Sequence, residues 1–241
     1  MKYYNRTWNP TLGCSPCSEG CENCFARELV EKRKKCEKNL TFDIRENKKQ
    51  LMSSFESGEE TIFVSGQSDL FHPSISERYL DKVFRKMNEA KEKHFLILTK
   101  RSSLLKDYFE NPCLFDNVGY LDFERMMFGV TVETNIRKKR IDDLLMTDKI
   151  KYRFISLEPM LEKISIEEYL KTGLINWIVV GCETGENRRN CEISWIKDVI
   201  EECKHYNIPV FVNKVNINGE ITENLPYEVN KREFFKDFKI Y

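Results

Sequence analysis

Short apolar runs alternate with amphipathic stretches along most of this chain, and this alternation restricts the folds open to it more than any other feature. The apolar runs have the length and composition of buried strands. They cover residues 61–65, 95–99, 126–132, 152–157, 177–181 and 210–213. Helical patterns precede or separate them, over residues 28–36, 76–93, 135–145, 164–170 and 193–206.

Strands that are apolar almost throughout, with helices between them, predict a parallel sheet covered by helices. The expected fold is therefore α/β, a barrel or partial (β/α) barrel of parallel strands. A chain of 241 residues fits one such unit, so we expect a single domain over residues 1–241. Residues after about 216, which include NGEITENLP, are predicted to form a polar turn region and a short C-terminal extension.

Polar or glycine-bearing residues follow each predicted strand. In parallel α/β folds the carboxyl ends of the strands bind ligands, so these side chains are expected at one mouth. Some will cap the helices that follow. Two carboxylates stand out, Glu158 and Glu183, because a carboxylate at the end of a buried strand requires a partner. The full set is Ser65, Gln67, Asp69, Thr99, Lys100, Arg101, Thr131, Glu133, Ser156, Glu158, Glu183, Asn213 and Lys214.

Four cysteines lie within the string CSPCSEGCENC near the start of the chain: Cys14, Cys17, Cys21 and Cys24. The last three have the spacing C-x3-C-x2-C, and closely spaced thiolates on one short segment are typical of iron–sulfur ligation. A zinc ribbon instead separates two C-x2-C pairs by roughly 12 to 20 residues. The spacing therefore favours an iron–sulfur cluster over zinc.

The other cysteines are scattered singly, at Cys36, Cys113, Cys182, Cys191 and Cys203, and most are interpreted as small buried hydrophobic residues. The first ten residues lack the apolar core of a signal peptide, and no apolar run approaches the roughly 18 residues of a membrane span. We therefore expect a cytoplasmic protein without membrane association, whose thiols stay reduced.

Basic and acidic residues both number 39, so the formal net charge is zero. The broad basic excess of a protein that coats nucleic acid is missing. Basic runs at residues 32–35 and 137–140 leave a local basic groove open, although such runs are also typical of a solvated helix face.

The cysteine loop followed by strand and helix repeats resembles the radical S-adenosylmethionine superfamily. The strings WNPTLGC, GCENCFA, SGQSDLF, LTKR, GVTVET, ISLEPM, VVGCETG and FVNK also occur in the order and spacing of its phage-associated three-cysteine-motif family, which resembles spore photoproduct lyases. This similarity extends from Trp8 to about Lys214.

The resemblance implies a [4Fe-4S] cluster whose open iron binds S-adenosylmethionine. An electron from a reductant protein such as a flavodoxin or ferredoxin would cleave that molecule, and the resulting 5′-deoxyadenosyl radical would take a hydrogen atom from the substrate. By their strand positions, the cofactor contacts expected are Ser65, Gly66 and Gln67 near the methionine amino group, Lys100 at its carboxylate, and Thr131, Glu133, Ser156 or Glu158 at the ribose. The expected catalytic residues are Cys182, Glu158 and Glu183.

Cys182 is open to two interpretations, a hydrogen donor at a strand end or a small buried residue. The third cluster ligand is likewise open. The superfamily spacing selects Cys17, whereas the family branch selects Cys14, and Cys21 and Cys24 are ligands under either rule. Ligation by all four cysteines would leave no open iron, and the alternative function is therefore a non-catalytic iron–sulfur protein for electron transfer or structure. Asn23 also stands where most superfamily members have an aromatic residue.

The likeness to photoproduct lyases favours a nucleobase in DNA or RNA as the substrate, flipped into the mouth and stacked on aromatic residues such as Trp8, Phe71 or Phe25. A small molecule or a peptide remains open.

Overall fold

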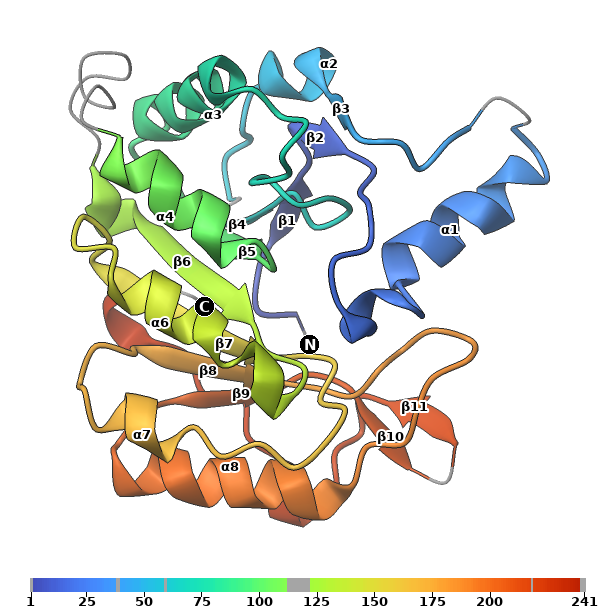
Figure 1. Cartoon of the computed structure of the whole chain (residues 1–241), viewed down its shortest axis with the longest axis vertical. Helices are drawn as coiled ribbons and strands as arrows, with labels where there is room; N and C mark the ends of the chain where they lie inside the picture. The colour runs from blue at the N-terminus through green and yellow to red at the C-terminus, as the bar shows by residue number, and fades with distance from the viewer. Residues whose placement is uncertain (1, 38–39, 59, 112–121, 218, 239–241) are drawn as a thin grey trace.

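The computed structural model describes residues 2–37, 40–58, 60–111, 122–217 and 219–238. Within these residues, seven parallel strands form one sheet that curls into a half-barrel, in the order β1-β4-β5-β6-β7-β8-β9 (Figure 1). Six of them match the predicted strands to within one residue at each end, which confirms the α/β class and the parallel sheet. The strands are β1 (Arg6–Trp8), β4 (Thr61–Val64), β5 (His94–Thr99), β6 (Met126–Thr131), β7 (Tyr152–Leu157), β8 (Trp177–Val180) and β9 (Val210–Val212).

The helices agree with the predictions where the apolar stripe is long. α3 begins after its N-cap Ser76, whose hydroxyl accepts a hydrogen bond from the Tyr79 amide at 3.3 Å. α8 buries Ile196, Val199 and Cys203 at helical spacing. The helices are α1 (Phe25–Lys34), α2 (Lys48–Leu51), α3 (Glu77–Glu89), α4 (Ser102–Glu110), α6 (Lys139–Leu145), α7 (Glu167–Leu170) and α8 (Ile193–His205). The described residues contain no helix long and apolar enough to cross a membrane.

Helices cover the convex face of the sheet, whereas α1 stands away from it (Figure 1). Residues along each strand alternate between the two faces, as the pleat requires. On β5, Phe95 and Ile97 join the large core under the helices, and Leu96 joins a smaller cluster on the concave face. The concave face can therefore form the wall of a site if it is closed at the amino ends of the strands.

Residues from both ends of the chain close the concave face at the amino ends of the strands. The ring of Tyr3 lies 5.4 Å from that of Trp177 and 5.2 Å from that of Phe211, measured between centroids. Phe238 is buried in the same cluster. Phe234, Phe235 and Phe238, which belong to the stretch after about residue 216 expected as a short extension, thus contribute to this floor. Short antiparallel pairs lie outside the main sheet, β2 (Thr11–Leu12) with β3 (Arg45–Glu46), and β10 (Val215–Ile217) with β11 (Glu220–Thr222).

Candidate functional site

The cysteines lie on a loop of residues 13–24, between β2 and α1, which we call the thiol loop. It begins at Gly13, whose backbone φ of +72° favours glycine. A Cβ atom there would also overlap the carbonyl oxygen of Asp43. The hydroxyl of Ser68 donates to the Gly13 carbonyl at 2.6 Å, and the Cys14 amide donates to the Phe42 carbonyl at 3.1 Å. The start of the loop is therefore fixed to its neighbours.

Arg101, directly after β5, holds the first part of the thiol loop. Its guanidinium donates to the carbonyl of Ser15 at 2.8 Å and to the sulfur of Cys14 at 3.5 Å. Asp69 positions this guanidinium through a contact of 3.0 Å. Asp69 also accepts hydrogen bonds from Thr99 at 2.7 Å. Asp69, Thr99 and Arg101 thus act together as an anchor for the loop.

Glu133, at the end of β6, lies fully buried beneath the middle of the loop, with 0% of the residue exposed. It accepts a hydrogen bond from Ser18 at 2.5 Å and pairs with Arg140 at 2.6 Å and with Lys100 at 3.3 Å. Lys100 in turn donates to the Gly20 carbonyl at 3.4 Å. A buried carboxylate with three donors satisfies the requirement for a partner, and it links two strand ends to the thiol loop.

Arginines beyond β6 and β8 hold the rest of the loop. Arg137 pairs with Glu19 at 2.6 Å, and its hydrogen bonds lower the pKa of Glu19 to about 2. Arg189 donates to the Glu19 carbonyl at 2.8 Å and pairs with Glu183 at 2.6 Å. Burial alone would raise the pKa of Glu183, but hydrogen bonds from Arg189 and Asn23 together lower it. Glu183 therefore has the partner that its position requires.

The thiols of the loop differ in their surroundings. The thiol of Cys17 donates to the sulfur of Cys21, and this hydrogen bond, aided by the charge of Lys100, lowers the pKa of Cys21 to about 4. Burial raises the pKa of Cys14. Across the described residues, no three histidine, cysteine or acidic side chains converge closely enough to hold a metal ion. Two sulfurs of the loop thus interact directly, but among the described residues they are not gathered into a closed metal site.

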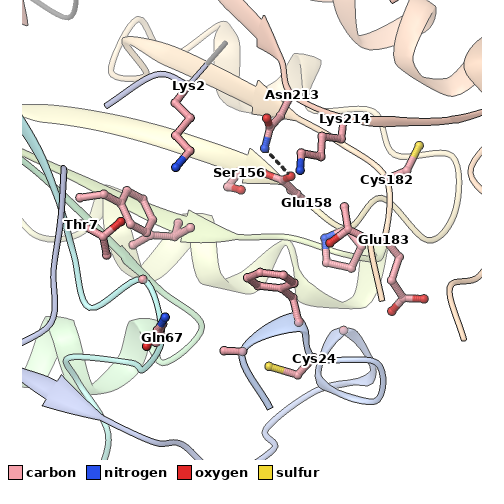
Figure 2. A pocket seen from close by; sticks show the side chains of 18 of the residues that line it. Lys2, Thr7, Cys24, Gln67, Ser156, Glu158, Cys182, Glu183, Asn213 and Lys214 are labelled. Atoms are coloured by element: carbon pink, nitrogen blue, oxygen red, sulfur yellow. Dashed lines mark hydrogen bonds between the residues drawn. The ribbon is translucent and has the colours of Figure 1, made fainter. Parts of the chain in front are cut away.

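A cavity of about 620 Å³ lies between the thiol loop and the concave face of the sheet. Cys24 lies on one side of it, and Ser156, Glu158, Asn213 and Lys214 lie on the other (Figure 2). The residues that line it come from β1, β4, β5, β7 and the segments after β8 and β9, together with the N-terminal segment and α1. The cavity thus occupies the carboxyl ends of the strands, where parallel sheets bind ligands.

The far side of the cavity carries a polar group of side chains. Glu158 accepts a hydrogen bond of 2.8 Å from the amide of Asn213. Gly181 lies between them, and a Cβ atom there would stand 2.8 Å from the Glu158 carboxylate. Burial raises the pKa of Glu158, although Asn213 and Lys214 oppose the shift. The carboxyl group is therefore held toward its neutral form, inside the cavity.

The structure separates the predicted site residues into two sets. One set lines the cavity: Gly66, Gln67, Lys100, Ser156, Glu158, Cys182, Glu183 and Cys24. The other set lies behind or beneath the thiol loop, or within it: Ser65, Thr131, Glu133, Cys14, Cys17 and Cys21. Ser65 shares a hydrogen bond of 2.9 Å with Thr11, and the carbonyl of Thr131 accepts from Arg140 at 2.6 Å. The roles assigned to these residues stay predictions.

Two of the expected stacking residues do not reach the cavity. Trp8 and Phe71 are buried in the core on the convex face, so the expectation that they stack on a base is wrong. Phe25 does line the cavity and is 58% exposed. Their neighbours in sequence gave no sign of which face each would take.

The scattered cysteines mostly follow the prediction. Cys182, Cys191 and Cys203 are buried, and the Cys191 thiol donates to the sulfur of Cys182. Cys36 is exposed, and the prediction of burial concerns most of these cysteines rather than all. Cys113 lies outside the described residues.

Sequence reasoning missed several residues of the site. Lys2, Tyr3 and Tyr4 line the cavity, although nothing in their spacing indicates it. Arg189 holds both Glu183 and the thiol loop. The sequence does indicate Arg189. Glu183 is a carboxylate at the end of a buried strand and requires a cation, and the next basic residues follow in the same loop.

These features define an α/β half-barrel protein with a thiol-bearing loop fastened over a cavity at the carboxyl ends of its strands. The chain belongs to the family described as "Protein of unknown function (DUF5131)", which matches residues 1–232. Comparison with curated proteins and with solved structures gives no match.

Proposed function

We propose that this protein is a radical S-adenosylmethionine enzyme. Its thiol loop would hold a [4Fe-4S] cluster through Cys17, Cys21 and Cys24, and its cavity would take S-adenosylmethionine and the substrate. One observation carries the proposal: the C-x3-C-x2-C loop lies over a cavity at the carboxyl ends of parallel strands, and Cys24 is part of the cavity wall.

The donor set fits an iron–sulfur cluster by its chemistry. Thiolates are the cluster ligands of proteins, and the low pKa of Cys21 provides one at neutral pH. Cys17 already contacts Cys21, whereas Cys14 takes a hydrogen bond from Arg101. We therefore assign Cys17 as the third ligand. Cluster binding requires the side chains of these cysteines to turn toward one another within the loop.

When bound, the cluster supplies the electron for reductive cleavage of S-adenosylmethionine, and a reductant protein such as a flavodoxin or ferredoxin would deliver that electron. The chain's own residues position the reactants. Lys100 places an ammonium group between the thiol loop and the cavity, where it can attract the methionine carboxylate. Gly66 and Gln67 border the same cavity.

The substrate should be small enough to enter the cavity, such as a small molecule or a single extruded nucleotide. The basic runs that could bind a nucleic-acid backbone are largely neutralised. Lys32 pairs with Glu186 at 2.8 Å, and Lys138 pairs with Glu168 at 3.3 Å. Cations already paired with carboxylates release few counterions on phosphate binding, so this observation favours a small substrate over a long nucleic acid.

Anaerobic reconstitution with iron and sulfide tests the proposal. After reduction with dithionite in the presence of S-adenosylmethionine, 5′-deoxyadenosine should appear on chromatography. Cys17→Ala should abolish the product, whereas Cys14→Ala should retain it. Cys36→Ala is the matched control, because Cys36 is an exposed cysteine after α1 that lines no part of the cavity.

The outcomes separate the alternatives. A fully loaded cluster without product would overturn the enzymatic proposal in favour of a non-catalytic iron–sulfur protein. Loss of product in Cys14→Ala but not in Cys17→Ala would overturn only the choice of the third ligand. A protein that binds no iron at all would contradict both the enzymatic and the non-catalytic iron–sulfur functions.

A further inference from the structure

A buried hydroxyl without a partner faces the cavity. Ser156, near the end of β7, is 1% exposed, and among the described residues its Oγ atom has no hydrogen-bond partner. Buried polar side chains in native proteins are nearly all hydrogen-bonded, and an unmet one costs free energy. Ser156 also lines the cavity, on the side opposite Cys24 (Figure 2). A ligand in the cavity is the natural partner for this hydroxyl.

The same side of the cavity presents two more polar groups. Ser156 leaves β7 on its concave face, and Glu158, the first residue after the strand, lines the same cavity. The Glu158 carboxyl group reaches across Gly181, which lacks a side chain, to the amide of Asn213 at 2.8 Å. Ser156, Glu158 and Asn213, which we call the polar wall, therefore place hydrogen-bond donors and acceptors side by side.

Two of the lysines that border the cavity are paired with carboxylates, and a third, Lys2, lies over the ring of Tyr4 with its ammonium 5.7 Å from the ring centroid. Lys100 pairs with Glu133 at 3.3 Å, and Lys214 pairs with Glu223 at 3.4 Å. An anion at the polar wall would meet the acceptor oxygens of Glu158. A cation would require Glu158 to ionise in a buried position, which desolvation opposes. An uncharged hydrogen-bonding group suits the wall better than either ion.

Aromatic rings complete the surroundings. Tyr4 and Phe63 line the cavity and stack on each other with their centroids 5.2 Å apart. Flat aromatic faces of this kind favour a planar ligand.

We infer that the polar wall is a binding subsite for a planar, uncharged group with a hydrogen-bond donor and acceptor side by side, as in a carboxamide or the N–H and C=O edge of a heteroaromatic ring. The inference deepens the proposed function by naming a substrate class, and it assigns Ser156 and Glu158 to the substrate in place of the ribose contact predicted for them. It rests on the proposed function only for the view that the bound group is a substrate. Binding itself requires no cluster.

Three probes of nearly equal shape test it. Benzamide is neutral, benzoate is anionic and benzamidine is cationic, and each can be titrated into the full-length apoprotein by ligand-observed NMR. Benzamide should bind most tightly. Ser156→Ala should weaken its binding about threefold to tenfold, the loss expected for one hydrogen bond between neutral groups. Glu158→Gln, which keeps a neutral donor and acceptor, should retain binding.

Thermal unfolding distinguishes a binding role from a structural one. Because the hydroxyl of Ser156 has no partner in the described residues, Ser156→Ala should leave the melting temperature unchanged or raise it. A structural serine would show the opposite shift. Ser194→Ala is the control, because Ser194 is exposed on α8 and should affect neither binding nor melting.

Tighter binding of benzoate or benzamidine than of benzamide would overturn the inference, as would equal binding of all three. It would also fall if Ser156→Ala lowered the melting temperature and left benzamide binding unchanged. These titrations use protein without a cluster. Failure of benzamide to bind would therefore not contradict S-adenosylmethionine cleavage. Absence of that cleavage would not contradict the subsite.

Discussion

Replacing Glu133 with alanine should be among the most damaging single changes near the site. The carboxylate is fully buried and faces two cations, Arg140 at 2.6 Å and Lys100 at 3.3 Å. Glu133→Ala would leave both cations without this carboxylate, and Ser18 would lose its acceptor at 2.5 Å. Breaking a buried ion pair by removing one partner typically costs about 3–5 kcal/mol.

The expected loss can be measured by urea unfolding and by thermal melting. For a chain of this size, 1 kcal/mol corresponds to about 2–4 °C, so Glu133→Ala should lower the melting temperature by roughly 6–20 °C. Glu168→Ala is the control. Glu168 pairs with Lys138 at 3.3 Å, but its side chain is 64% exposed. Exposed pairs contribute about 0–1 kcal/mol, so the control should melt within about 4 °C of the parent protein.

Hydrogen exchange adds a local readout. The Cys21 amide donates to the Ser18 carbonyl at 2.9 Å, and Ser18 is held by Glu133. In Glu133→Ala this amide should exchange faster, even under conditions where the sheet stays folded. A stability loss below about 1 kcal/mol, with unchanged exchange at Cys21, would refute the view that this buried ion cluster holds the thiol loop.

Three further outcomes follow from the same contacts. Gly20→Ala would place a Cβ atom 2.5 Å from the Glu133 side chain, and urea unfolding should show a loss of about 1–3 kcal/mol; a neutral result would mean that the loop can shift freely. Arg189→Ala should cost about 1–3 kcal/mol, because Glu183 loses its paired cation, and Arg189→Lys should recover only part of it. In the folded protein burial raises the pKa of Glu158, so its contribution to stability is fully present below the unfolded pKa of about 4.3 and is lost as pH rises through the folded pKa. Glu158→Gln should flatten this decline in urea midpoints measured between pH 4 and 8, and parallel profiles would contradict the assignment.

The sheet could be predicted because its strands are buried on both faces and therefore read as continuous apolar runs. β1 could not. Its three residues, Arg6–Trp8, do not form such a run, and its strand conformation depends on pairing with β4, from Arg6 beside Ile62 to Trp8 beside Val64. α4 could not be predicted either, because it begins at Ser102, after only two residues, Lys100 and Arg101, that separate it from β5. In both cases tertiary contacts decide a segment whose local pattern is weak.

The sequence places polar residues at the mouth but does not say which way each one faces. Ser156, on the concave face of β7, and Glu158, directly after that strand, both line the cavity. Asp69 instead holds Arg101 and Thr99 behind the thiol loop. Strand ends bend and their loops diverge, so the alternation that predicts a face within a strand no longer predicts it a few residues beyond the end. The division into cavity and anchor residues therefore required the structure.

The residues that anchor the thiol loop come from the ends of three different strands. Arg101, Glu133, Arg137 and Arg189 reach the thiol loop from the segments after β5, β6 and β8. Arg101 contacts Ser15, Glu133 contacts Ser18, and Arg137 and Arg189 both contact Glu19. The curvature of the sheet, rather than the loop alone, therefore sets where the thiols lie relative to the cavity. Substitutions of these anchors should reduce iron loading and leave benzamide binding intact, because they do not form the polar wall. Substitution of Ser156 should weaken benzamide binding and leave iron loading intact. If one class of variant impaired both properties in protein that remained folded, the thiol loop and the polar wall would have to be a single cooperative unit.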